Sequence, residues 1–131
     1  NLERADDTQA GHLGTGMSES SGIFTFPSTG IYKITANAQF LRNNAEILYA
    51  GVYIFATGDN FSSEDYLASS FGYINNTASA YQNVVTHAVY DVTDVTNNKV
   101  KFKYQSNPGF YMTADTGANA TFFLFQKLGD T

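Results

Sequence analysis

The sequence lacks cysteine and has few basic residues. Without cysteine, the fold can contain neither a disulfide bond nor a thiolate metal site. Small secreted animal domains often carry a disulfide bond, so this absence favours a bacterial or viral source. Seven basic residues stand against twelve acidic ones, which gives a formal net charge of −5 at pH 7. Such a surface repels phosphate backbones and anionic lipid, and we expect no nucleic-acid partner.

Long apolar runs and catalytic motifs are absent as well. No apolar run approaches the roughly 20 residues that cross a bilayer, so we expect no membrane insertion. The sequence begins at Asn1 without a charged leader and apolar block, and we expect a processed product or part of a longer one. It contains no Gly-x-Ser-x-Gly elbow and no His-Glu-x-x-His helix. We therefore predict no enzyme; the enzymatic alternative, a glycan-active jelly roll, would need paired carboxylates in a cleft.

Aromatic residues are abundant, and they favour strands. The 131 residues fit one domain, 43% of them are hydrophobic, and 11 are Phe and 9 are Tyr. Pro27 and Gly30 predict a turn, after which residues 32–40 alternate strictly between apolar and polar side chains. This period of two is typical of a half-buried strand, so at least one sheet is expected.

Turn residues divide the chain into about eight strands at the spacing of a sandwich or jelly roll. We predict an all-β, antiparallel jelly-roll β-sandwich of about eight to ten strands. Residues 1–21 are expected to form an extended N-terminal arm or edge strand, and residues 22–131 the jelly-roll domain. The region 57–79 is expected to be loops around one or two short strands.

Two predicted strands, 46–56 and 120–128, are apolar on both faces. One face of each can enter the core, and the other needs a cover, because soluble monomers rarely expose large apolar patches. A second copy of the chain would provide one, whereas the alternative is a loop or the N-terminal arm of the same chain. The residues predicted to form an interface between copies are Leu48, Val52, Ile54, Phe122, Phe123, Leu124 and Phe125.

Two segments resemble a known superfamily. Phe24-Thr25 is followed by Gly30-Ile31-Tyr32 at the start of an alternating strand, and residues 121–130 read Thr-Phe-Phe-Leu-Phe-Gln-Lys-Leu-Gly-Asp. These segments resemble the first and last core strands of the trimeric jelly-roll superfamily of complement component 1q heads and tumour necrosis factor. The resemblance spans residues 22–130, although complement heads usually place proline next to the glycine. It implies a homotrimer that binds receptors, glycans or other proteins.

On this basis we predict a non-enzymatic trimeric recognition module. The first interpretation is a bacteriophage virion protein, either a capsid decoration or a fibre knob, that stabilises the particle or attaches it to a host surface. The alternative is a secreted ligand of complement or tumour-necrosis-factor type. The loops 57–79 and 106–118 would face outward, and the aromatic residues predicted to contact partners, unless they only pack within their loops, are Phe61, Tyr66, Tyr73, Phe110 and Tyr111.

Acidic residues in the region 57–79 are candidates for calcium binding. Asp59, Glu64 and Asp65 could supply the oxygen ligands that calcium requires, and some members of the superfamily bind calcium near the trimer apex. The alternative is a set of solvated turns. No EF-hand spacing is present, and we predict no other cofactor.

His87 and a row of lysines are the remaining candidates. His87 lies within an alternating strand and is predicted to be a core or interface residue and not a catalytic base. Lys99, Lys101 and Lys103 form a basic stripe on one strand face. This stripe could meet an anionic partner, but lysines on an outward face usually act as solubilising residues.

Overall fold

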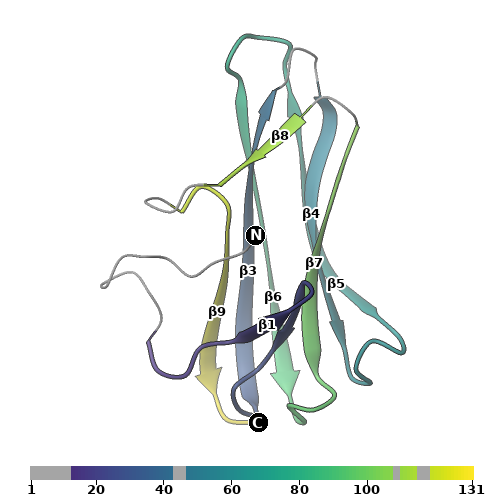
Figure 1. Ribbon diagram of the computed structural model, residues 1–131, viewed down its shortest axis with the longest axis vertical. Helices are drawn as coiled ribbons and strands as arrows, with labels where there is room; N and C mark the ends of the chain where they lie inside the picture. Colours follow the sequence, from purple (N-terminus) through teal and green to yellow (C-terminus); the bar gives the residue numbers. More distant parts are fainter. Residues whose placement is uncertain (1–12, 43–46, 108–109, 115–118) are drawn as a thin grey trace.

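The computed structural model describes residues 13–42, 47–107, 110–114 and 119–131 (Figure 1). These residues form nine strands and no helix. The strands are β1 (Ser18–Ser20), β2 (Ile23–Thr25), β3 (Gly30–Arg42), β4 (Ile47–Thr57), β5 (Asp65–Ile74), β6 (Tyr81–Val92), β7 (Lys99–Ser106), β8 (Phe110–Thr113) and β9 (Phe122–Gly129). The all-β prediction is therefore confirmed.

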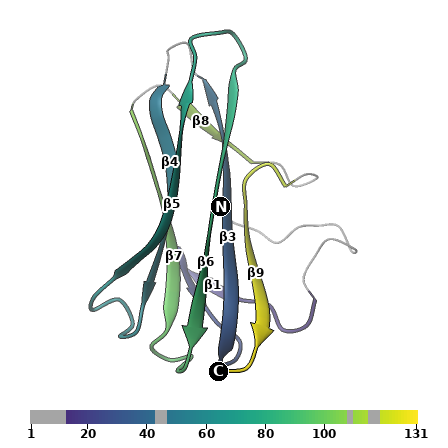
Figure 2. The same cartoon turned by 180° about the vertical axis from the view of Figure 1, so that it is seen from behind.

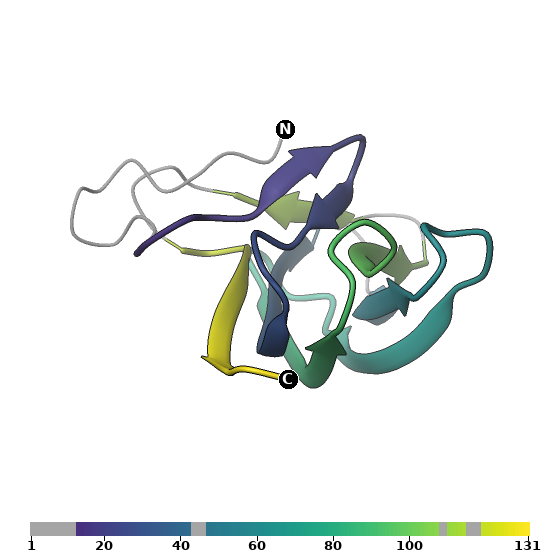
Figure 3. The same cartoon turned by 90° about the horizontal axis from the view of Figure 1, so that it is seen from below.

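The strands build two antiparallel sheets that pack face to face (Figures 1 and 2). One sheet has five strands in the order β1-β2-β7-β4-β5. The second has β6, β3 and β8 in order, and β9 also pairs with β3. The view along the strands in Figure 3 shows the two layers. We call them the β4 sheet and the β3 sheet.

β3 is the central strand of its sheet because other strands pair along both of its edges, and it begins directly after a tight turn. The Tyr32 hydroxyl donates to the Ser28 carbonyl oxygen across the turn at 3.0 Å. β6 pairs with β3 along residues 30–41, whereas the opposite edge of β3 is divided between β9, along 31–37, and β8, along 39–42. The apolar residues of the alternation, from Tyr32 to Phe40, point inward and are buried.

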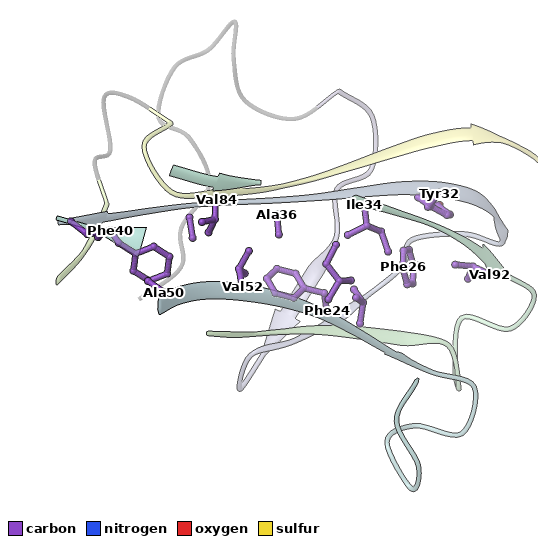
Figure 4. Packing of buried hydrophobic residues seen from close by; sticks show 14 residues of the cluster. Phe24, Phe26, Tyr32, Ile34, Ala36, Phe40, Ala50, Val52, Val84 and Val92 are labelled. Carbon is purple, nitrogen blue, oxygen red and sulfur yellow. The ribbon is translucent and has the colours of Figure 1, made fainter. Parts of the chain in front are cut away.

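The core lies between the sheets and is made by both of them (Figure 4). Its largest fully buried side chains include Phe40 and Ile34 from β3, Ile54 from β4 and Val100 from β7. Full burial of one such side chain stabilises the fold by about 1.5–3 kcal/mol. The core therefore holds the sheets together, while each sheet keeps one outer face for other contacts.

One segment differs from its prediction. Residues 65–74, expected to hold one or two short strands among loops, form the single ten-residue strand β5. Its alternation is hidden in the sequence because a register shift opposite Ile54 and Phe55 interrupts the pairing with β4. At the N-terminus, β1 pairs with β2 at the edge of the β4 sheet, and residues 1–12 lie outside the described part of the chain.

Candidate interaction surfaces

The predicted interface residues of β4 do not form one surface. Val52 and Ile54 are 2% and 0% exposed and pack in the core of the single chain, so their assignment to an interface is corrected here. Leu48, near the start of β4, is 61% exposed. β4 is apolar on both faces because Tyr53 and Phe55 turn outward and pack with neighbouring rings of the same sheet.

The predicted interface residues of β9 divide between the two faces of the β3 sheet. Phe123 and Phe125 turn inward and pack against the core, where both rings contact Phe24. Leu124 turns outward and is 51% exposed. Phe122 lies opposite Asn37 of β3 and is half-buried.

The outer face of the β3 sheet exposes several large apolar side chains. In the pairing register, Thr35 lies between His87 of β6 and Leu124 of β9. His87 is exposed, so it does not belong to the core, and it shares this face with Val85 and Val89. We define the β3-sheet face by its exposed apolar side chains, which are Tyr81, Val85, Val89, Tyr111 and Leu124.

Sequence reasoning grouped Val85 and Val89 with His87 on one strand face but did not name them as interface residues. The sequence pattern shows this grouping, because both valines lie two positions from His87 in an alternating strand and therefore on the same strand face. The alternating pattern does not show which of the two strand faces turns outward. The pairing register of β6 with β3 determines this.

The outer face of the β4 sheet carries a cluster of aromatic rings, which we call the aromatic platform and define as Tyr53, Phe55, Tyr66 and Phe71. The Tyr53 ring centroid lies 5.8 Å from that of Phe55, 5.8 Å from that of Tyr66 and 5.3 Å from that of Phe71. Three of these four rings were not predicted as contact residues. Their outward orientation depends on the pairing of β4 with β5, which the sequence does not display.

Glu64 binds two lysines beside the aromatic platform. Its carboxylate oxygens lie 2.5 Å from Lys101 Nζ and 2.6 Å from Lys103 Nζ. Hydrogen bonds from Lys101 and then Lys103 hold the pKa of the Glu64 carboxyl below its usual value. Each ammonium group also lies over an aromatic ring, Lys101 over Phe61 at 4.2 Å and Lys103 over Phe55 at 4.3 Å. Two lysines of the predicted basic stripe thus share one carboxylate, which leaves the stripe of Lys99, Lys101 and Lys103 with a net positive charge.

The three predicted calcium ligands are engaged elsewhere or stand apart. Asp59 accepts hydrogen bonds from Thr57 Oγ1 at 2.6 Å and from the Ser63 backbone N and Oγ at 2.9 and 2.7 Å. These bonds, the one from Thr57 first, lower the pKa of Asp59 to about 2. Glu64 binds lysines, and Asp65 begins β5. Within the described residues, no three histidine or carboxylate side chains gather in a way that could hold a metal ion.

The predicted partner-binding aromatic residues lie on different surfaces. Tyr66 and Tyr73 are 58% and 51% exposed on β5, whereas Tyr111 is 57% exposed on β8. Phe61 is half-buried beneath Lys101, and Phe110 packs against Phe40 of the core. They do not form a single loop surface.

An apolar groove of about 370 Å³ opens between the sheets where β8 and β9 share the edge of β3. Phe24, Phe102 and Phe123 form much of its wall, with few polar atoms. A catalytic site needs convergent polar groups, and this lining does not supply them. In the part of the chain that the structure describes, no helix is long and apolar enough to cross a membrane.

Comparisons with known proteins find similar folds among solved structures. No family model and no curated protein matches the sequence. Among solved structures, murine APRIL at pH 8.5 has a TM-score of 0.65 at 17% identity, covering 88% of this chain and 78% of that one. The structure of Eiger TNF from S. frugiperda has a TM-score of 0.67 at 11% identity, covering 88% and 70%. The two antiparallel sheets and these similarities show a jelly-roll fold similar to the folds of murine APRIL and Eiger TNF.

Proposed function

We propose that this protein is a non-enzymatic recognition module that assembles as a homotrimer through its β3-sheet face. The observation that carries the proposal is the exposure of Val85, Val89 and Leu124, each more than half exposed on one regular sheet face. An apolar face of this kind on a soluble protein is typical of a protein interface. The number of chains in the assembly, three, is inferred from the resemblance of the sequence to the trimeric jelly-roll superfamily.

Charge distribution supports the β3 sheet over the β4 sheet as the assembly surface. Lys101, Lys103 and Glu64 lie on or beside the outer face of the β4 sheet, and charged residues are depleted in the cores of protein interfaces. The centre of the β3-sheet face is less charged: Val85, Val89 and Leu124 surround the row of Thr35 and His87, and the charged residue among them is Lys33, opposite Val89. Assembly through this face leaves the aromatic platform in solvent.

Substitution of Val89 by Asp tests the assembly. Val89 is 62% exposed, so Val89→Asp leaves the core intact but places a charge within the proposed interface. Light scattering after size exclusion should give about three times 14.3 kDa for the parent protein and 14.3 kDa for the variant. Asn76→Asp adds the same charge in an exposed loop and should remain trimeric. A parent protein that is monomeric at micromolar concentration contradicts the proposal.

Two settings for such a module are proposed, one favoured by the fold and the other by the sequence. The similarity in fold to Eiger TNF favours a secreted ligand of tumour-necrosis-factor type. The absence of cysteine favours a virion protein, a capsid decoration or fibre knob that serves particle stability or host attachment. An antibody against the folded protein, applied to purified virus particles and to the secreted fraction of the source, separates these settings. Detection in neither fraction contradicts both.

A further inference from the structure

Phe71 lies flat on the β4 sheet because its partner in the register, Gly51, has no side chain. A Cβ on Gly51 would lie 2.4, 2.6 and 2.7 Å from Cδ1, Cε1 and Cγ of the Phe71 ring. Because these three distances are nearly equal, the ring turns its face and not its edge toward Gly51. The opposite ring face is therefore directed at solvent, in agreement with the 45% exposure of Phe71.

Polar groups at fixed positions surround this ring. The Tyr53 ring is nearly perpendicular to the Phe71 ring, at an interplanar angle of 82°, and its hydroxyl donates to Gln105 Oε1 at 2.5 Å. The Tyr66 hydroxyl and Ser69 Oγ share a hydrogen bond. Each of these groups keeps a free donor or acceptor position beyond the bond it makes. The aromatic platform thus combines a flat apolar surface with hydroxyl and amide groups at its rim.

The lysines beside the platform exceed their carboxylate partner by one positive charge, but both are already engaged in contacts within the chain. Lys101 and Lys103 share the carboxylate of Glu64, and both ammonium groups lie over aromatic rings. The whole chain carries a formal net charge of −5, which repels anions at long range.

We propose that the aromatic platform binds a neutral glycan, with a pyranose ring stacked on Phe71. The C–H groups on one face of a pyranose carry partial positive charge and suit the negative face of an aromatic ring. Its hydroxyl groups lie around the ring edge, where Gln105, Tyr53 and Ser69 can donate and accept hydrogen bonds. A few polar groups around an apolar surface are the usual composition of a small-ligand site.

This inference rests on the proposed recognition function, for which it names the ligand class and the surface. It does not depend on the trimer, because the platform and the β3-sheet face lie on opposite outer faces of the sandwich. The oligomeric state of each variant, measured beside glycan binding, separates failure of the one proposal from failure of the other.

The full chain should be titrated with a set of neutral oligosaccharides, namely cello-, malto-, manno- and fully N-acetylated chito-hexaose, and with hyaluronan hexasaccharide as the acidic probe. Binding is followed by the backbone amide resonances of Gly51 and Phe71 in NMR spectra. At least one neutral hexasaccharide should shift both resonances, with a dissociation constant of about 1 mM or tighter. The dissociation constant should be insensitive to added salt, because no ion pair forms.

Three variants test the stacking itself. Phe71→Leu keeps an apolar side chain but removes the flat ring, and it should weaken binding about tenfold. Gly51→Ala should have a similar effect, because its methyl group displaces the ring from the sheet. Gly58→Ala is the control, since a Cβ there meets only an ordinary contact, 3.8 Å from Asn98 Nδ2, and its affinity should equal that of the parent.

Four results overturn the proposal: no neutral hexasaccharide binds at millimolar concentration, only hyaluronan binds, Phe71→Leu binds as tightly as the parent, or addition of salt abolishes binding. A platform that self-associates or binds another protein would give the first of these results.

Discussion

Phe102 of β7 and Phe123 of β9 stack face to face, with ring centroids 3.7 Å apart and only 6° between the ring planes. The two residues belong to different sheets, and their stacking joins the sheets at an edge of the sandwich where the strands do not pair. Phe24 lies edge-on to both rings, at centroid distances of 5.4 and 6.2 Å. This aromatic contact therefore replaces hydrogen bonds between strands in holding that edge.

Truncation of this contact should destabilise the fold strongly. Phe123→Ala removes the stacked ring and leaves a space beside the existing groove, so we expect the free energy of unfolding to fall by about 3 kcal/mol. Phe123→Leu retains part of the buried volume and should cost clearly less. Urea unfolding followed by far-ultraviolet circular dichroism measures both. Equal losses for the two variants would mean that stacking geometry, and not buried volume, dominates.

Much of the fold could be predicted from the sequence, because the alternation of apolar and polar residues along a strand shows which side chains are buried. Tyr32, Ile34 and Phe40 were expected on the inner face of β3, and all three are buried. The two-faced strands were also recognised as apolar on both faces, but within the single chain their outer faces are not fully covered, since Leu48 and Leu124 are 61% and 51% exposed. Periodicity does not tell which sheet a strand joins, however, and β4 pairs with β7 and β5 while β9 pairs with β3.

The candidate surfaces could be predicted less well from the sequence. They depend on which residues lie opposite one another in neighbouring strands. Gly51 and Phe71 are twenty positions apart, and nothing in their spacing shows that the ring will lie on the glycine. Likewise, Val85 and Val89 turn outward because β6 pairs with β3 in one register, and a slip by one residue would bury them.

Asn98 is expected to stabilise the loops at one end of the sandwich. Its Oδ1 accepts hydrogen bonds from the Thr93 and Asp94 backbone N at 2.9 and 2.8 Å, and its Nδ2 donates to the Tyr90 hydroxyl at 2.9 Å. Asn98 is 7% exposed, so Asn98→Ala leaves buried polar groups without partners. We expect a loss of about 1–3 kcal/mol in thermal or urea unfolding.

An exposed asparagine gives the control for this prediction. Asn76→Ala changes the same side chain in a loop where it is exposed, and the free energy of unfolding should stay within about 0.5 kcal/mol of the parent value. If both variants unfold alike, the Asn98 bonds do not contribute to stability.

Asp59 should contribute a pH-dependent part of the stability. Its pKa is lowered from 3.8 to about 2, chiefly by the hydrogen bond from Thr57, so the folded state favours the carboxylate. The resulting stabilisation is fully present above the unfolded-state pKa and is lost as the pH falls through the folded-state pKa. The difference in urea midpoint between the parent and Asp59→Asn should therefore be constant near neutral pH and shrink toward about pH 2.

Asp65→Asn provides the comparison, because it removes an exposed carboxylate at the start of β5. A difference between parent and Asp59→Asn that does not change with pH would contradict the role of the Thr57 and Ser63 bonds.

Gly30 should be the most sensitive glycine of the described chain, because it combines backbone strain with close contact. Its φ of +141° lies in a region that side-chain-bearing residues rarely adopt. A Cβ at this position would lie 2.6 Å from the Gly129 carbonyl oxygen and 2.4 Å from Lys127 Cε. The lysine can move, but the carbonyl belongs to β9, which pairs with β3 here. Gly30→Ala should therefore lower the free energy of unfolding by at least about 1–3 kcal/mol.

Two further variants separate the causes of that loss. Gly129→Ala is the matched control, since a Cβ there meets open space, and its unfolding free energy should be close to that of the parent. Combining Gly30→Ala with Lys127→Ala removes the flexible contact and leaves the backbone strain and the clash with the carbonyl oxygen. If the double variant regained the stability of Lys127→Ala alone, the lysine contact would be the cause. The geometry leads us to expect that most of the loss persists, because the turn before β3 and the end of β9 must approach this closely for the strands to pair.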